Sequence, residues 1–293
     1  MKKIISFVLL AVLIAAPARA GVKAPKDEKV KNVILIIGDG MGLGAAAAWM
    51  ANNDFGPTCF DRSQFAAIVK TYSANSKTTD SAAAATAMAT GHKTNNSMLG
   101  MLPDSTKPAS IARLAKEKGK SVGIVVTSYV LDATPGAFYA HVARRGERKN
   151  IAEDLIAFRP DVIVGGGRKY FTAPKYTDVN LVEKAKDAGF TYVGSPEEFY
   201  TTRATPILGL FDDGPEIEAT QTDSDLLTDL AGHTLEIIGA NKHGFFAMFE
   251  GSLIDHAAHA NNTEDVIWRM EAFDKLVNSA FDYADAHEGT LVI

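Results

Sequence analysis

Short apolar runs rich in β-branched residues constrain the fold of this chain more than any other feature. The first covers residues 33–37 (VILII) and ends at Gly38-Asp39-Gly40. Runs that are apolar on both faces are typical of strands buried inside parallel sheets. Similar runs, each predicted to be a buried strand, recur at residues 67–69, 122–126, 162–164, 245–249 and 291–293.

Stretches with helical spacing of apolar residues separate these runs. The longest covers residues 263–287, and Gly289 is expected to end it. Strands that alternate with helices predict an α/β fold with a doubly wound, mostly parallel sheet and helices on both faces. The other predicted helices cover residues 82–89, 111–117, 181–188 and 225–238.

The composition indicates a folded globular chain. Of 293 residues, 46% are hydrophobic and 22% are charged, with one Cys, which excludes a disordered tail, a collagen-like fibre and a disulfide scaffold. We see no internal repeat, so residues 21–293 are predicted to form one α/β domain, in which residues 168–222 could be an excursion from the sheet. The formal net charge of −5 gives no reason to expect nucleic acid binding.

Residues 1–20 have the pattern of a secretory signal peptide. Lys2 and Lys3 precede an apolar run at residues 4–16, and an A-x-A sequence ends at Ala20. The apolar run is shorter than the roughly 20 residues that span a bilayer, so no membrane anchor is expected. We therefore predict cleavage near Ala20 and a periplasmic or secreted protein, in which the single thiol of Cys59 is a small buried hydrophobe.

In doubly wound folds, ligands bind beyond the carboxyl ends of the strands. Asp39 follows the first predicted strand between glycines, where its carboxylate could bind a metal or cap a helix. Ser81 begins an alanine-rich helix, whose N-terminus favours an anionic group such as phosphate. The alternative for this second motif is a plain helix N-cap, formed by Asp80 or by Ser81.

A carboxylate-rich and histidine-rich segment follows the predicted strand at residues 245–249. Glu250 stands at the strand end, and Asp255 and His259 lie four residues apart, on one face of a predicted helix. A carboxylate and an imidazole so placed could hold one zinc ion. The alternative is a solvated helix start with two incidental histidines, His256 and His259.

A fourth segment combines oxygen ligands with arginine. Asp132 and Thr134 offer a carboxylate and a hydroxyl, which suit a magnesium site, and Arg145 could hold phosphate oxygens with two N–H groups. Alternatively, Pro135 only opens a helix and Arg145 lies on a solvated face.

Taken in this order, the four segments resemble the alkaline phosphatase family. The resemblance spans residues 32–293 and implies the family's α/β fold with its C-terminal strands missing. It is carried by DSAAAATA at residues 80–87, DATPGAFYAHVARR at 132–145, DVIVGGGRKYF at 161–171 and EGSLIDHAAHAN at 250–261.

The resemblance also implies hydrolysis of small phosphate monoesters, with two Zn²⁺ and one Mg²⁺ per subunit and inorganic phosphate as product. It is compatible with a homodimer. The resemblance implies that Ser81 is the nucleophile that becomes phosphoserine and also a zinc ligand, and that Asp39 bridges that zinc and the magnesium. It implies that Thr134 and Glu250 are magnesium ligands and that Asp255 and His259 bind the other zinc. Arg145 is then the phosphate clamp, and Asp132 and His256 contact metal-bound water or phosphate.

The sequence departs from the family pattern at its end. Family members supply further zinc ligands from an Asp-His pair after a later strand and from a His beyond it, whereas this chain stops at residues 290–293. Each zinc site would then keep two protein ligands, so we expect a C-terminally truncated chain with little or no activity. The alternatives are a non-catalytic metal- or phosphate-binding remnant and a phosphodiesterase of the same superfamily, although diesterases often use Thr where this chain has Ser81.

Overall fold

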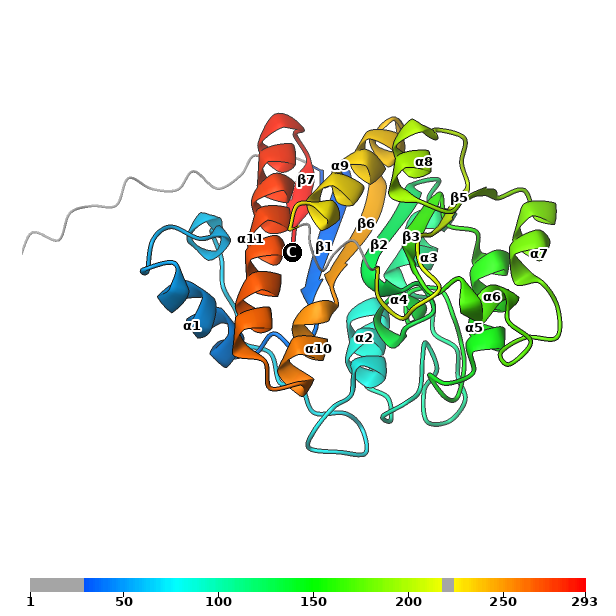
Figure 1. The fold of residues 1–293 in the computed structure, drawn as a ribbon, viewed down its shortest axis with the longest axis horizontal. Coiled ribbons are helices and arrows are strands. Elements are labelled where there is room, and N and C mark those ends of the chain that lie inside the picture. The colour runs from blue at the N-terminus through cyan, green and yellow to red at the C-terminus, as the bar shows by residue number, and fades with distance from the viewer. Residues whose placement is uncertain (1–28, 218–223) are drawn as a thin grey trace, which may run out of the picture.

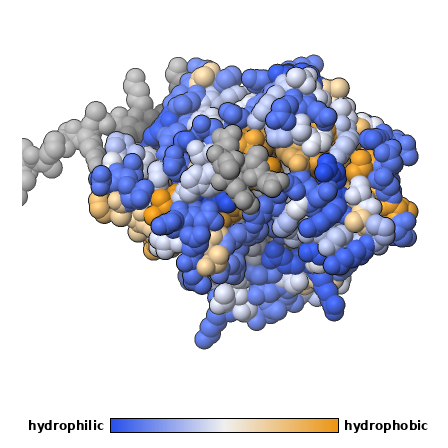
Figure 2. Space-filling view, viewed as in Figure 1, coloured by the Kyte–Doolittle hydropathy of each residue, from blue (hydrophilic) through white to orange (hydrophobic). Residues whose placement is uncertain are grey.

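The computed structural model describes residues 29–217 and 224–293. The predicted signal peptide and its cleavage site at Ala20 lie outside the described residues. Among the helices of these two ranges, none has both the length and the apolar character needed to cross a bilayer. The face shown in Figure 2 is mainly hydrophilic, with apolar side chains in separate patches.

One parallel sheet forms the centre of the molecule (Figure 1). All its strand pairs are parallel, in the order β4-β5-β3-β2-β6-β1-β7, which confirms the predicted fold class. The strands are β1 (Asn32–Gly38), β2 (Ser121–Tyr129), β3 (Val162–Gly166), β4 (Thr191–Val193), β5 (Ile207–Leu210), β6 (Phe245–Gly251) and β7 (Thr290–Val292).

Helices cover both faces of this sheet, as predicted. One apolar core lies between the sheet and α2 (Ser81–Thr90), α3 (Ile111–Glu117), α4 (Ala133–Gly136), α5 (Arg148–Phe158), α6 (Lys169–Thr172) and α7 (Leu181–Asp187). The core of the opposite face lies under α8 (Pro196–Thr201), α9 (Leu226–Gly239) and α11 (Thr263–Ala286). A smaller cluster joins α11 to α1 (Leu43–Asn52) and α10 (Leu253–His259), and a short 3₁₀ helix, η1 (Cys59–Arg62), lies against α11 and buries Cys59 as expected.

The central strands are buried because side chains pack on both of their faces. Every residue of β6 is buried, and the ring of Phe246 stacks on that of Phe138 with 5.9 Å between centroids. On the other face, Phe245, Ala247 and Phe249 contact the core under α9 and α11. This two-sided burial is the physical origin of the continuous apolar runs in the sequence.

The predicted strand at residues 67–69 is wrong. Residues 65–72 have no regular secondary structure, and Ile68 and Val69 are exposed. A strand needs a neighbour that accepts its backbone hydrogen bonds, and within the described residues no strand runs beside this segment. An apolar run alone therefore did not determine its structure.

Two strands that the sequence did not predict lie within residues 168–222. β5 pairs with β3, and β4 pairs with β5, so this segment extends the sheet at one edge. Thr191 in β4 and Gly209 in β5 interrupt their apolar residues, so neither strand shows a continuous apolar run.

We expect Phe246→Ala to lower the free energy of unfolding by about 3–5 kcal/mol, because it removes a buried ring and leaves a cavity. Urea denaturation of the purified chain measures this change. Phe65→Ala makes the same chemical change at a side chain that is 84% exposed, and it should alter stability by less than about 0.5 kcal/mol. Equal effects of the two substitutions would contradict the core described here.

Candidate active site

The site lies where the central strands end. In the β1–β6 and β2–β6 pairs, Glu250 is the register partner of Ile37 on one side and of Val126 on the other. Asp39 follows the last residue of β1, one strand away. The parallel arrangement therefore brings two acids from distant parts of the sequence together at the carboxyl ends of neighbouring central strands, which we call the site edge of the sheet.

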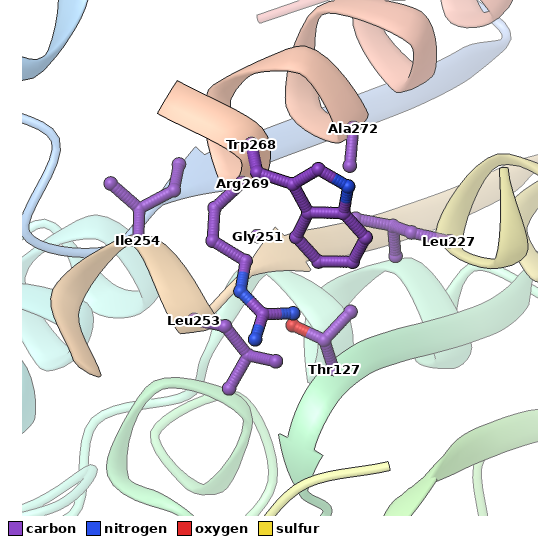
Figure 3. A pocket seen from close by; sticks show the side chains of 8 residues that line it. All are labelled: Thr127, Leu227, Gly251, Leu253, Ile254, Trp268, Arg269 and Ala272. Atoms are coloured by element: carbon purple, nitrogen blue, oxygen red, sulfur yellow. The ribbon is translucent and has the colours of Figure 1, made fainter. Parts of the chain in front are cut away.

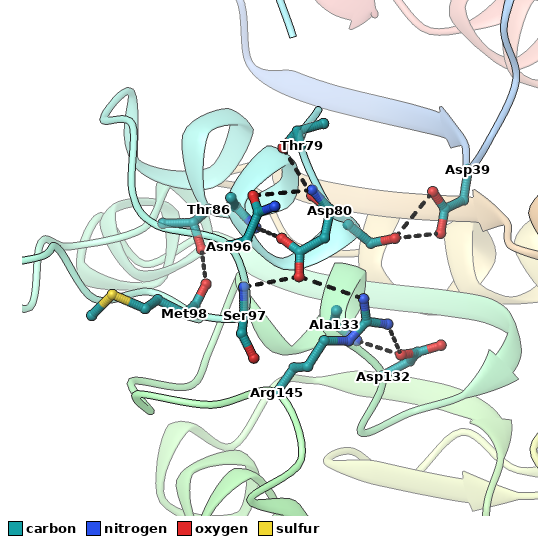
Figure 4. Close-up of polar contacts among 12 residues, drawn as sticks. Asp39, Thr79, Asp80, Thr86, Asn96, Ser97, Met98, Asp132, Ala133 and Arg145 are labelled. Carbon is teal, nitrogen blue, oxygen red and sulfur yellow. Dashed lines mark hydrogen bonds and ion pairs between the residues drawn. The ribbon is translucent and has the colours of Figure 1, made fainter. Parts of the chain in front are cut away.

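The hydroxyl of Ser81 is directed at this edge. Ser81 is the first residue of α2, and its Oγ donates a hydrogen bond to Oδ2 of Asp39 at 3.1 Å (Figure 4). The N-cap is Asp80, whose Oδ1 accepts from the backbone N–H of Ala83 at 2.9 Å. Because Asp80 caps the helix, the Ser81 hydroxyl is left for other chemistry in the positive potential of the helix N-terminus.

Arg145 is held beside the start of α2. Its Nη2 donates to Oδ1 of Asp132 at 3.0 Å, and its Nη1 lies 3.8 Å from Oδ2 of Asp80 (Figure 4). Its backbone N–H donates to the carbonyl of Ser97, and the Ser97 N–H donates to Asp80. The loop that carries Arg145 is thus fastened to the residue that precedes the candidate nucleophile.

Asp132 and Thr134 enter the site from the short helix α4. Asp132 is its N-cap, accepting from the N–H of Ala133 at 2.7 Å, and Thr134 is buried. Asp132 therefore caps a helix and also pairs with Arg145, so Arg145 does not lie free on a solvated face, and the role of this segment in magnesium and phosphate binding stays a prediction.

Glu250 is a buried acid whose carboxylate oxygens are not all hydrogen-bonded to described residues. Its side chain is 1% exposed, and its Oε2 finds no hydrogen-bond partner within the described part of the chain. Burial raises the pKa of Glu250 well above its usual value, and the charges of Asp39 and Asp132 raise it further. Burial, followed by the charge of Asp255, also raises the pKa of Asp39. The strand ends therefore concentrate more negative charge than the local hydrogen bonds stabilise.

Helix α10 supplies the remaining predicted residues. Oδ2 of Asp255 lies 3.5 Å from Nε2 of His259, so the two share one face as predicted. Nδ1 of His256 lies 2.7 Å from Oε1 of Glu216. The pKa of His256 is raised, chiefly by the hydrogen bond that its ring donates to Glu216.

Gly40 makes the close approach of α10 to β1 possible. Its φ is +65°, in the left-handed region, and a Cβ atom there would lie 2.6 Å from Oδ1 of Asp255. A side chain at this position would therefore push Asp255 away from Asp39.

The oxygen donors suit a hard divalent cation. The carboxylates of Asp39 and Glu250, with the hydroxyl of Thr134, match the ligand chemistry of magnesium. A cation at this place is favoured because Oε2 of Glu250 is buried and has no hydrogen-bond partner among the described residues. The described residues match the ligand requirements of zinc less well. Asp255 and His259 make one ligand pair, whereas catalytic zinc usually takes three protein ligands. Within residues 29–217 and 224–293, no group of three His, Cys, Asp or Glu side chains is arranged to hold an ion.

A small cavity near the site is too narrow for a substrate. It lies between β6, α10 and α11, next to Thr127, Leu227, Trp268 and Arg269 (Figure 3), and its volume of about 20 Å³ leaves room for about one water molecule.

Sequence reasoning identified Asp39 and Glu250 at the ends of β1 and β6 but missed Glu216 and Ser97. Neither follows a predicted strand, and Glu216 lies in the segment that had weak periodicity. No local pattern marks them, because each acts through a contact with a distant residue.

A serine at a helix N-terminus, an arginine beside it and a cluster of acids beyond a parallel sheet are the kinds of side chain that phosphate-transfer chemistry uses. The sequence model of the alkaline phosphatase family matches residues 30–293, so the chain belongs to the alkaline phosphatase family.

Individual relatives agree with this assignment. Alkaline phosphatase 3 of Bacillus subtilis is 35% identical over 95% of this chain, which spans 63% of the length of that relative. Streptomycin-6-phosphate phosphatase of Streptomyces griseus is 31% identical, covering 97% of this chain and 77% of the relative. Among solved structures, the alkaline phosphatase of the Antarctic bacterium TAB5 superposes with a TM-score of 0.83 at 31% identity, covering 90% of this chain and 78% of that one.

We expect Gly40→Ala to lower the free energy of unfolding by at least about 1 kcal/mol, because alanine is disfavoured at positive φ and its Cβ would collide with Asp255. Thermal or urea unfolding measures the change. Gly44→Ala is the control, since nothing lies within 4 Å of its Cβ position on α1 and alanine favours helix; it should be neutral or stabilising by up to about 1 kcal/mol. A neutral Gly40→Ala would contradict the close packing of Asp255 on Gly40.

Proposed function

We propose that this chain hydrolyses phosphate monoesters through a phosphoserine formed on Ser81. The observation that carries the proposal is the Ser81 hydroxyl at the N-terminus of α2, hydrogen-bonded to Asp39, with the guanidinium of Arg145 held beside the same helix start. Nucleophile, anion clamp and acidic ligands then surround one space at the edge of the sheet.

The side chains divide the chemistry between them. The Ser81 oxygen loses its proton and bonds to phosphorus while the bond from phosphorus to the leaving alcohol oxygen breaks, and that oxygen takes up a proton. Asp39 accepts the hydrogen bond of the hydroxyl and orients its oxygen for this attack. Arg145 donates N–H groups to the phosphoryl oxygens that do not react. Water then cleaves the phosphoserine, and inorganic phosphate and free Ser81 are regenerated.

Two zinc ions and one magnesium ion are part of this proposal. Asp39, Thr134 and Glu250 would hold magnesium; Asp39 and Ser81 would bind one zinc, and Asp255 and His259 the other. When bound, these ions would lower the pKa of the Ser81 hydroxyl and of water and balance the charge of the transferring group. Asp132 and His256 would contact phosphate or bound water from the two sides of the site.

The relatives support the substrate class. Those compared are phosphatases by name, and one is named for streptomycin 6-phosphate. A structure of a TAB5 variant is described with Mg bound in its M3 site. Small phosphate monoesters are therefore the substrates that we propose for this chain.

We expect Ser81→Ala to abolish both phosphoserine formation and hydrolysis of p-nitrophenyl phosphate, because the attacking oxygen is removed. Because each proposed zinc would have two protein ligands among the described residues, we expect little turnover in the unsubstituted chain. Mass spectrometry of the chain after incubation with substrate, Zn²⁺ and Mg²⁺ is therefore the primary measurement, with p-nitrophenol release as the second.

Ser195→Ala is the matched control, since Ser195 also stands at a helix N-terminus, as the N-cap of α8. This variant should keep the phosphate label and the rate. Label or turnover that survives Ser81→Ala would overturn the mechanism. Faster release from bis-p-nitrophenyl phosphate than from the monoester would instead favour a phosphodiesterase, and phosphate binding without label would favour a binding protein.

Magnesium should stabilise the chain through Glu250. A ligand that binds only the folded state adds about 2.7 kcal/mol at a concentration one hundred times its Kd, so the midpoint of thermal unfolding should rise as Mg²⁺ is added to metal-free protein. We expect Glu250→Gln to remove most of this rise, whereas Glu197→Gln, on the surface of α8, should leave it unchanged. An unchanged rise in Glu250→Gln would exclude Glu250 as a ligand.

A further inference from the structure

The ring of His256 contacts Glu216, a residue outside its own helix. His256 lies on α10 between Asp255 and His259, and its Nδ1 lies 2.7 Å from Oε1 of Glu216. Both side chains are about one-third exposed, so water competes only in part with this contact. The pair joins residues that are 40 positions apart in the sequence.

The backbone around Glu216 is fixed against the end of β2. Glu216 forms an antiparallel bridge with Ser128, and the next residue, Ile217, donates its N–H to the carbonyl of Thr127 at 3.1 Å. The side chain of Ile217 is 2% exposed and belongs to the core under α9. Gly166 of β3 allows the close approach, because a Cβ there would lie 3.3 Å from the carbonyl carbon of Glu216. The Glu216 carboxylate is thus delivered to His256 by a fastened segment.

This contact determines which ring nitrogen carries the proton. A carboxylate only accepts hydrogen bonds, so Nδ1 of His256 must be the donor. A neutral imidazole has one N–H, and Nε2 is then left as an acceptor. A fixed ring plane and a fixed tautomer together give Nε2 a defined position and a defined chemical role.

The ring also lies among the groups of the proposed site. Asp255 is its neighbour on α10, and the charges of Asp132 and Asp255 both act on it. Asp132 in turn holds the guanidinium of Arg145, the proposed phosphate clamp. His256 is therefore a partner of the phosphate end of the site.

We propose that Glu216 is a positioning residue, which fixes the ring plane and tautomer of His256 so that Nε2 accepts a hydrogen bond from an ordered water that contacts the bound phosphate group. This inference rests on the proposed function for its effect on phosphate. The contact between Glu216 and His256 itself does not depend on that function, and the two can be tested separately.

The first experiment determines the tautomer of His256 and does not depend on catalysis. Long-range ¹H–¹⁵N correlation spectra of the metal-free full chain, recorded where imidazole is neutral, should show His256 with its proton on Nδ1; His256→Gln identifies the signal. Glu216→Ala should lose this preference, and Glu216→Gln, whose amide oxygen still accepts, should retain it. His287, whose Nδ1 lies 2.8 Å from the carbonyl of Tyr283, is the internal control and should not change. An unaltered His256 signal in Glu216→Ala would overturn the inference.

The second experiment reads the consequence for phosphate. Binding of inorganic phosphate to the metal-loaded chain, measured by calorimetry, should weaken about three- to tenfold in Glu216→Ala, the size of one hydrogen bond. In the His256→Gln background, Glu216→Ala should have no further effect, because Glu216 acts through His256. Glu183→Ala, on the exposed surface of α7, is the control and should bind phosphate normally.

The outcomes separate the two proposals. Equal weakening by Glu216→Ala in both backgrounds would show that Glu216 does not act through His256 and would overturn the inference. If the unsubstituted chain binds no phosphate, the proposed function fails together with the role of Glu216 toward phosphate, whereas the tautomer spectra still decide whether Glu216 positions His256.

Discussion

The concentration of negative charge at one edge of a parallel sheet is the constraint on which the site depends. Adjacent parallel strands end on the same side, so β1 and β6 place Asp39 and Glu250 together, at the cost of burying Glu250 fully and Asp39 in part. Neighbouring groups offset part of this cost. Ser81 donates to Asp39, and Arg145 donates to Asp132. The remaining negative charge favours positively charged partners at these strand ends, where Ser81, the proposed nucleophile, and Arg145, the proposed phosphate clamp, both donate to carboxylates.

Features encoded by local periodicity were predictable from the sequence. The longer strands are apolar on both faces, and α11 has apolar residues at every turn, so both could be recognised without knowledge of the fold. Residues 67–69 have the same local appearance as a strand, yet they are exposed. Whether an apolar run pairs depends on a neighbouring strand from elsewhere in the chain, and a local pattern carries no information about that neighbour.

The residues of the site likewise differ in whether a local sequence pattern marks them. Asp39, Ser81, Glu250 and Asp255 could be found because each follows a strand or begins a helix, and the topology of a doubly wound sheet determines where such positions lie. The sequence left open whether Asp80 or Ser81 caps α2, and only the geometry assigns the cap to Asp80. Glu216 had no signal, because its partner lies on another element and its own loop has no periodic pattern.

The tethering of Arg145 has a consequence for how an anion would enter and leave. Asp132, Asp80 and the Ser97 backbone already order this residue, so an incoming anion need not immobilise a long flexible side chain, and that entropic cost is met during folding. The same two carboxylates compete with the anion for the N–H groups of the guanidinium. A guanidinium that is ordered in advance and also held by competing acceptors would bind an anion quickly and release it readily, as the phosphate clamp proposed for Arg145 would require.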